Sequence, residues 1–162
     1  IFTACGLVWI LSKFKWPGLI VLGLLAFVSL QSLYTNYFFV FPIEQSDSFH
    51  YALSKAIPYV RARENNYEKI VFSNKDNLYQ SYMPYLYYNR FDPGEYQRLG
   101  GTKSGGFAET HIIGKYEFRP INWQSEGRGL YVGNLLEFPE GVTGVEIANK
   151  AGKTVTKIAE HE

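Results

Sequence analysis

The chain has 162 residues, with 16 Lys and Arg against 15 Asp and Glu, so its formal net charge is +1. This even balance, without a basic stripe or an acidic tail, argues against a role in nucleic-acid binding. Cys5 is the single cysteine, which excludes an internal disulfide and a cysteine metal site. Any soluble part must therefore be stabilised by its hydrophobic core alone. The aromatic content of 17% indicates that aromatic side chains build much of that core.

The N-terminal quarter of the chain is apolar and predicts membrane segments. Residues 1–12 are expected to end one transmembrane helix, 13–15 to form a turn, and 16–41 to form the last transmembrane helix and its interface. The stretch Trp16–Tyr34, WPGLIVLGLLAFVSLQSLY, carries no charge. With the aromatic residues behind it, it is long enough to cross a hydrocarbon core about 30 Å thick.

The orientation of these segments follows from Lys13 and Lys15, which lie between two apolar runs. Short loops that contain Lys and Arg stay in the cytoplasm, so the domain after Pro42 is expected on the other side of the plasma (inner) membrane. A signal peptide is the alternative, but its charges would precede the apolar run and small residues would follow it. We therefore expect an extracytoplasmic domain on a membrane protein.

The residues after Pro42 alternate between helical and strand patterns. A polar linker at 42–48 precedes a domain at 49–162, and Ser46 or Asp47 is expected to cap its first helix. This order predicts a small α/β (α+β) domain with layered helices and a mixed sheet. In its first half we expect a helix at 48–64 bent or divided at Pro58, a strand at 69–73, and a helix at 78–89 interrupted by Pro84. A turn at Asp92–Gly94 and a mobile glycine loop at 100–106 are expected next. The second half should hold strands at 115–123, 130–132, 145–148 and 154–158, the last two as a hairpin.

The titratable residues form no catalytic pattern. The histidines, His50, His111 and His161, lack any metal-ligand spacing, so no metal site is expected. No serine lies in a G-x-S-x-G elbow. Lys103 stands inside the glycine loop without the order that a phosphate-binding P-loop requires.

Two carboxylates and a group of tyrosines have simple structural interpretations. Asp76 suits a helix cap and Asp92 the start of a turn. The tyrosines at 79, 82, 85, 87 and 88 have the spacing of a packed helix face, with stacking on sugars or contact with a membrane as alternatives. The candidates for substrate binding are Tyr82, Tyr85, Arg90 and His50.

The stretch Ile70–Gln97, IVFSNKDNLYQSYMPYLYYNRFDPGEYQ, resembles the C-terminal extracytoplasmic region of bacterial membrane glycosyltransferases of family 39. These are relatives of dolichyl-phosphate-mannose protein mannosyltransferases and of lipid A aminoarabinose transferases. The later segments KYEFRPINW and LYVGN also look like that region. The motif that carries the resemblance consists of Phe91, Asp92, Pro93, Tyr96 and Gln97.

The resemblance implies an enzyme of the GT-C class with several membrane spans, for which this chain is the C-terminal part. Such an enzyme transfers a sugar from a polyprenyl-phosphate donor to an acceptor outside the cytoplasm. Its catalytic base is expected upstream of Ile1, so no residue here is assigned a catalytic role. The implied partners are the lipid bilayer, the upstream helices and the lipid-linked sugar, with no cofactor on this chain and the metal of the whole enzyme left open.

Two other functions fit the same residues. The chain can be a membrane-anchored extracytoplasmic binding or structural module without catalysis. A self-sufficient hydrolase is the third reading, although the usual nucleophile and metal patterns are missing from the sequence.

Overall fold

The computed structural model describes residues 2–102 and 110–162, and the chain forms two compact units, Ile1–Pro42 and Ile43–Glu162. The predicted glycine loop at 100–106 lies outside the described residues from 103 onward.

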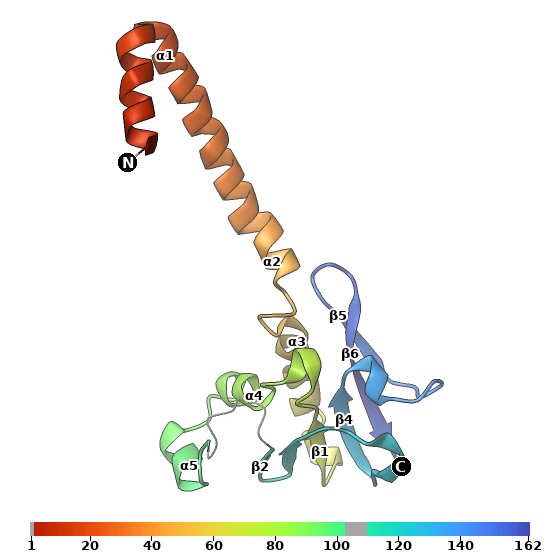
Figure 1. Cartoon of the computed structure of the whole chain (residues 1–162). Helices are drawn as coiled ribbons and strands as arrows, with labels where there is room; N and C mark the ends of the chain where they lie inside the picture. Colours follow the sequence, from red (N-terminus) through yellow and green to blue (C-terminus); the bar gives the residue numbers. More distant parts are fainter. Residues whose placement is uncertain (1, 103–109) are drawn as a thin grey trace. The chain divides into compact units, whose positions relative to one another are not determined.

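The first unit is helical along its whole described length. Helix α1 spans Phe2–Thr35, and the π-helical turn η1, Asn36–Val40, leads into α2, Phe41–Glu44. Figure 1 shows α1 folding back sharply, so that a short arm precedes a long one. Residues 13–15, predicted as a turn, lie within α1, and so does Pro17, a residue type that commonly kinks helices.

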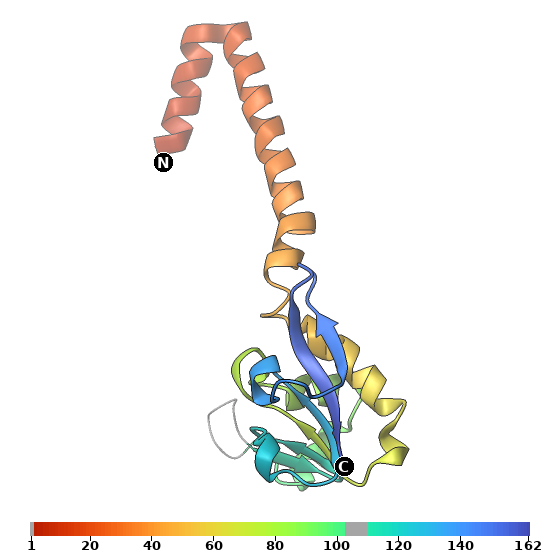
Figure 2. The same ribbon diagram turned by 90° about the vertical axis from the view of Figure 1, so that its right-hand side faces the viewer.

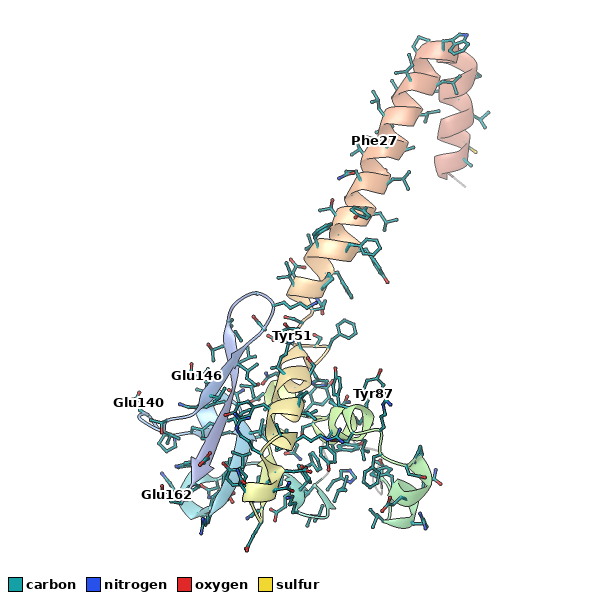
Figure 3. The ribbon with its side chains drawn as sticks, turned by 180° about the vertical axis from the view of Figure 1, so that it is seen from behind. Phe27, Tyr51, Tyr87, Glu140, Glu146 and Glu162 are labelled. Atoms are coloured by element: carbon teal, nitrogen blue, oxygen red, sulfur yellow. The ribbon has the colours of Figure 1, made fainter. Side chains whose placement is uncertain are left out.

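One segment of this region, Trp16–Glu44, is long and apolar enough to cross a membrane, with a mean hydropathy of 1.8. Its 29 residues correspond to about 43 Å of helix. Its side chains project on all sides of the long arm, Phe27 among them (Figure 3), and almost none is buried by the chain. The predicted apolar helix is therefore present, although it continues through Pro42 instead of stopping there.

The second unit is a mixed α/β domain built on one six-stranded sheet, as the sequence predicts. The strand order is β2-β3-β1-β4-β6-β5. Strand β1 is central and pairs in parallel with both β3 and β4, whereas the other pairs are antiparallel. The strands are β1 Ile70–Phe72, β2 His111–Ile113, β3 Tyr116–Phe118, β4 Gly129–Gly133, β5 Val145–Ala148 and β6 Thr154–His161.

Helix α3, Tyr51–Arg61, covers one face of this sheet. Its residues Leu53, Ile57 and Val60 recur at helical spacing and are fully buried in one cluster with the strand residues. Phe72 and Phe118, from adjacent strands, stack there with ring centroids 5.7 Å apart. Most buried hydrophobic residues in the described part of the domain belong to this cluster. Burial of each such side chain contributes about 1.5–3 kcal/mol, so this face supplies most of the core's stability.

The opposite face is covered by short 3₁₀ turns instead of a long helix. Val71 and Tyr131 point to this side and pack with Ile121 and Phe138. Figure 2 shows α3 on one side of the sheet and these turns on the other. The predicted strand at 115–123 ends at Phe118, because its second half leaves the sheet to build this cover. The turns are η4, Trp123–Ser125, and η5, Leu135–Glu137.

The start of the domain differs from the prediction of a linker and a capped helix. Helix α3 begins at Tyr51 after His50, whose φ of 53° is left-handed, and no side chain caps it. Ser46 is buried, and both Asp47 carboxylate oxygens accept from Asn149 Nδ2 at 3.1 Å. The polar stretch is thus a hydrogen-bonded part of the domain.

The predicted helix at 78–89 is two elements, η3 (Asp76–Leu78) and α4 (Tyr82–Tyr88). Pro84 falls in the first turn of α4, where backbone N–H groups have no helical partner, so it does not interrupt the helix. Pro58 lies inside α3 without dividing it. Asp76 is no helix cap, because it is the first residue of η3 with a left-handed φ of 49°.

The family-motif residues build a short helix, α5, Pro93–Arg98, instead of the predicted tight turn. Asp92 Oδ1 accepts from the backbone N–H groups of Gly94 and Glu95 at 2.6 and 3.0 Å. Pro93 occupies the first helical position, which favours proline. Phe91 and Tyr96 pack against the core. Gln97 is exposed, so the other four motif residues, Phe91, Asp92, Pro93 and Tyr96, are the ones that form and dock α5.

We predict that Asp92→Ala frees the two amides at the start of α5 and destabilises that helix by about 1 kcal/mol. Hydrogen exchange of the chain in detergent should then be faster in residues 93–101, with the sheet unchanged. Gln97→Ala, on the same helix, should leave exchange as it is. Equal protection of α5 in the Asp92→Ala variant and the original chain would contradict the capping role.

Candidate functional site

The parallel strands β1, β3 and β4 place three loops at one edge of the domain, outside their carboxyl ends. The chain passes from β1 to β3 on one side of it and then to β4 on the other, so β1 is a topological switch point. Ligands of open α/β sheets bind in the crevice at such a point. This edge, called the carboxyl edge below, is therefore the first place to look for a site.

One carboxylate connects all three loops. Glu137 Oε1 accepts from Ser73 Oγ at 2.8 Å, after β1, and from the Ile121 N–H at 3.1 Å, after β3. Its Oε2 accepts from the Asn134 N–H at 2.9 Å, after β4. Asn134 in turn caps η5 and forms a capping box with Glu137. The geometry of the carboxyl edge therefore depends on this side chain.

The last residue of β4, Gly133, is closely surrounded by the side chains of this arrangement. A Cβ added at Gly133 would lie 3.0 Å from Glu137 Oε2 and 2.8 Å from Ile121 Cδ1. Such contacts are closer than ordinary packing allows, so any side chain would push Glu137 or Ile121 aside.

Two cavities lie at the carboxyl edge, and Leu136, with 91% of its surface exposed, lines both. The first, of about 440 Å³, lies beside the start of the domain. The second, of about 380 Å³, lies beside the loop after β3. Polar residues of the first cavity are Asp47, Asp76, Asn77, Asn134, Lys153 and Thr154. Residues of the second include Lys75, Asn122, Trp123, Gln124, Glu137 and Phe138.

Three polar side chains of the first cavity are joined by hydrogen bonds. Asn134 Nδ2 donates to Asp76 Oδ2 at 3.4 Å and to Asn77 Oδ1 at 3.3 Å. His50 Nδ1 lies 3.0 Å from the Asn77 carbonyl oxygen, so Nδ1 carries the proton, because a carbonyl only accepts. His50, predicted to bind substrate, therefore holds the loop after β1.

The loop after β3 is held by an ion pair. Arg119 donates to both Glu126 oxygens at 2.5 and 2.7 Å and to Glu117 at 2.7 Å, and Lys69 lies within 3.7 Å of both carboxylates. The Arg119 hydrogen bonds lower the Glu126 pKa to about 2, and Glu126 is only 5% exposed. The hydrogen bonds that Arg119 donates to Glu126 raise the Arg119 pKa; burial opposes this effect and the hydrogen bond to Glu117 reinforces it.

This loop carries Trp123, which is half-buried in a group of rings. Its ring centroid lies 5.1 Å from that of Phe138, 5.6 Å from Tyr131 and 4.6 Å from His161. The Tyr131 hydroxyl donates to the Gly127 carbonyl at 2.7 Å. Burial, with the Glu126 charge as the next cause, raises the Tyr131 pKa to about 12. The indole is thus fixed in the wall of the second cavity.

The four predicted substrate-binding residues are not brought together. Tyr82 and Tyr85 are 1% and 8% exposed within the core, which excludes them as platforms for a sugar. The core interpretation of these two tyrosines is confirmed. Arg90 is exposed just after α4, with a left-handed φ of 51°, and lines neither cavity. The tyrosines at 79, 87 and 88 are exposed, Tyr87 most of all (Figure 3).

No three His, Cys, Asp or Glu side chains within residues 2–102 and 110–162 are placed to hold a metal ion. The carboxyl edge instead offers hydrogen-bonding groups and apolar surface. This combination suits binding of a polar organic ligand.

Comparison with known proteins adds no further constraint, because no family model, curated protein or solved structure matches the chain. The glycosyltransferase resemblance thus stays a prediction. Sequence reasoning also missed Glu137 and Trp123. Glu137 had a local signal, since N-x-x-E at residues 134–137 is typical of a capping box. Trp123 had none, because its position depends on three loops that are distant in sequence.

We predict that Glu137→Gln destabilises the domain by about 1–3 kcal/mol, because an amide NH₂ would face an N–H or O–H donor in place of one carboxylate oxygen. Hydrogen exchange of β1 and β4 in detergent gives the free energy of unfolding of each variant. Exchange should also rise at residues 119–125 and 134–138. Glu140→Gln, in the exposed loop before β5 (Figure 3), is the matched control. An unchanged free energy of unfolding for Glu137→Gln would show that the hydrogen bonds accepted by Glu137 do not stabilise the domain.

The Glu126 pKa makes stability depend on acid pH. Its folded value of about 2 is below the ordinary 4.5, so the carboxylate stabilises the domain fully above pH 4.5 and loses this effect as the pH falls toward 2. Glu126→Gln should therefore cost about 2–3 kcal/mol at pH 7 and flatten the stability profile between these values. Glu68→Gln, at an exposed position, should keep the original profile. The ion-pair explanation fails if both variants give the same acid profile.

Proposed function

We propose that this chain is the C-terminal part of a polytopic membrane glycosyltransferase, and that its α/β domain covers the active-site cavity on the extracytoplasmic face. The observation that carries the proposal is where the chain comes into the domain. Asp47, shortly after the apolar unit, lines the first cavity together with Asp76 and Asn134. The carboxyl edge is thus built partly from the residues that directly follow the candidate membrane segment.

The resemblance in Ile70–Gln97 supports the sugar-transfer part of the proposal. In the implied reaction a base removes a proton from the acceptor hydroxyl or amine, which attacks the anomeric carbon as the lipid phosphate leaves. The base belongs to the upstream part of the enzyme. This domain excludes water and orients the acceptor, and such positioning accounts for large rate effects without any proton transfer.

The motif residues support a structural contribution to this role. Asp92 and Pro93 start α5, and Phe91 and Tyr96 fix it to the core. The motif thereby secures the domain that covers the cavity. None of its side chains lines either cavity at the carboxyl edge.

A membrane-anchored binding module without catalysis is the second candidate. It is favoured by the two cavities at the carboxyl edge, which offer hydrogen-bonding groups and apolar surface to a ligand. The two functions differ upstream. A transferase requires further membrane spans before Ile1 and an acidic residue in an early extracytoplasmic loop, and a module requires neither.

We predict that ending the full-length protein after Pro42 lowers sugar transfer to the normal acceptor by about 100-fold, because the acceptor loses its positioning. The measurement is transfer from a polyprenyl-phosphate sugar in membranes that contain equal amounts of the intact and shortened proteins. Gln97→Ala in the intact protein is the control for handling and should transfer normally. A normal rate in the shortened protein would show that the domain does not serve the reaction.

A further inference from the structure

The second cavity holds polar groups that the fold does not use. In the part of the chain that the structure describes, neither the indole N–H of Trp123 nor the side-chain amides of Asn122 and Gln124 make a hydrogen bond. All three residues line the cavity, together with Lys75, whose ammonium group forms no ion pair in that part of the chain. These groups are available to a ligand.

The first cavity differs in this respect. Its Asn134, Asp76 and Asn77 side chains bond to one another, and Asp47 is bonded to Asn149. A ligand there would have to compete with these internal hydrogen bonds. The second cavity imposes no such cost, so it is the better candidate for binding.

The lining of the second cavity is also selective in its chemistry. The Glu137 carboxylate already accepts three hydrogen bonds from the protein, so it does not call for a cation. The half-buried Trp123 supplies aromatic surface, and the carboxamides of Asn122 and Gln124 both donate and accept. A pyranose ring matches this set, because one face presents C–H groups to an aromatic ring while neighbouring hydroxyls pair with planar amides.

We propose that this cavity binds a hexose ring, with the C–H face of the sugar on Trp123 and its hydroxyls on Asn122, Gln124 and Lys75. The inference rests on the proposed function for the choice of a sugar over other hydroxyl-rich molecules. It assigns to the carboxyl edge a sugar unit of the donor or the acceptor, and moves sugar recognition from the buried tyrosines to Trp123.

The site is held in place before any ligand arrives. Trp123 is fixed by ring contacts to Phe138 and Tyr131, and its loop by the Arg119–Glu126 pair and the Ile121 hydrogen bond to Glu137. Such preorganisation reduces the entropy that binding costs. A weak ligand such as a single sugar ring needs this advantage.

Direct binding to the chain tests the proposal. Trp9→Phe and Trp16→Phe leave Trp123 as the only tryptophan, and a detergent without a sugar head group avoids competition. Methyl hexosides of gluco, manno and galacto configuration are titrated while tryptophan emission is followed. We expect saturable binding of at least one hexoside with Kd near 1 mM, and transfer of NMR saturation to its ring C–H protons.

Variants locate the binding. Gln124→Ala should weaken it by about tenfold, and the matched Gln97→Ala, on α5, should leave it unchanged. Hexosides that do not bind at about 10 mM, or that bind Gln124→Ala as tightly as the original chain, overturn the proposal. This outcome is separate from the transfer test. If the shortened protein loses sugar transfer but the chain binds no hexoside, only the sugar site is refuted. Binding without any loss of transfer on shortening refutes only the covering function.

Discussion

The Glu137 carboxylate is the interaction on which the carboxyl edge depends. Strands β1 and β3 have three residues each, so their ladders alone cannot fix the loops that follow them. Glu137 accepts one hydrogen bond from the loop after each parallel strand. Hydrogen bonds to a charged group contribute about 1.5–3 kcal/mol each, and loss of one partner leaves the others strained or unsatisfied. Both cavities, and the turn that bears Leu136 between them, follow from this junction.

Local sequence patterns correctly predicted the elements whose formation depends on neighbouring residues. The apolar run at 69–73 forms β1, and the alternating residues at 145–148 and 154–158 form the hairpin of β5 and β6. The sheet order is a different matter, because the place of β1 between β3 and β4 is decided by pairing between distant segments. The predicted strand at 115–123 failed for the same reason. Beyond Phe118, contacts with Tyr131 and Phe138 outweigh the alternating pattern.

Residue type alone was a poor guide to the site. Tyr82 and Tyr85 have the rings that a sugar site uses, but helical spacing places them against Phe118. Burying the rings in the core there lowers the free energy of the folded chain more than leaving them exposed would. His50 is taken up by the Asn77 carbonyl. The side-chain polar groups of Asn122, Trp123 and Gln124, which form no hydrogen bond within the described residues, lie in a turn whose sequence has no distinctive motif. They become a candidate site only because Arg119 and Glu137 hold the loop after β3 in place.

The beginning of the domain joins these observations. The sequence predicted a polar linker at 42–48, outside the domain. Instead Ser46 is buried, Asp47 is bonded to Asn149, and Lys150 lies over the Tyr51 ring at 5.4 Å. The first residues of the domain are therefore part of its carboxyl edge. The hairpin turn at 149–153 and the chain after Pro42 are thus bonded to each other, and the first cavity, which Asp47 lines, includes this stretch.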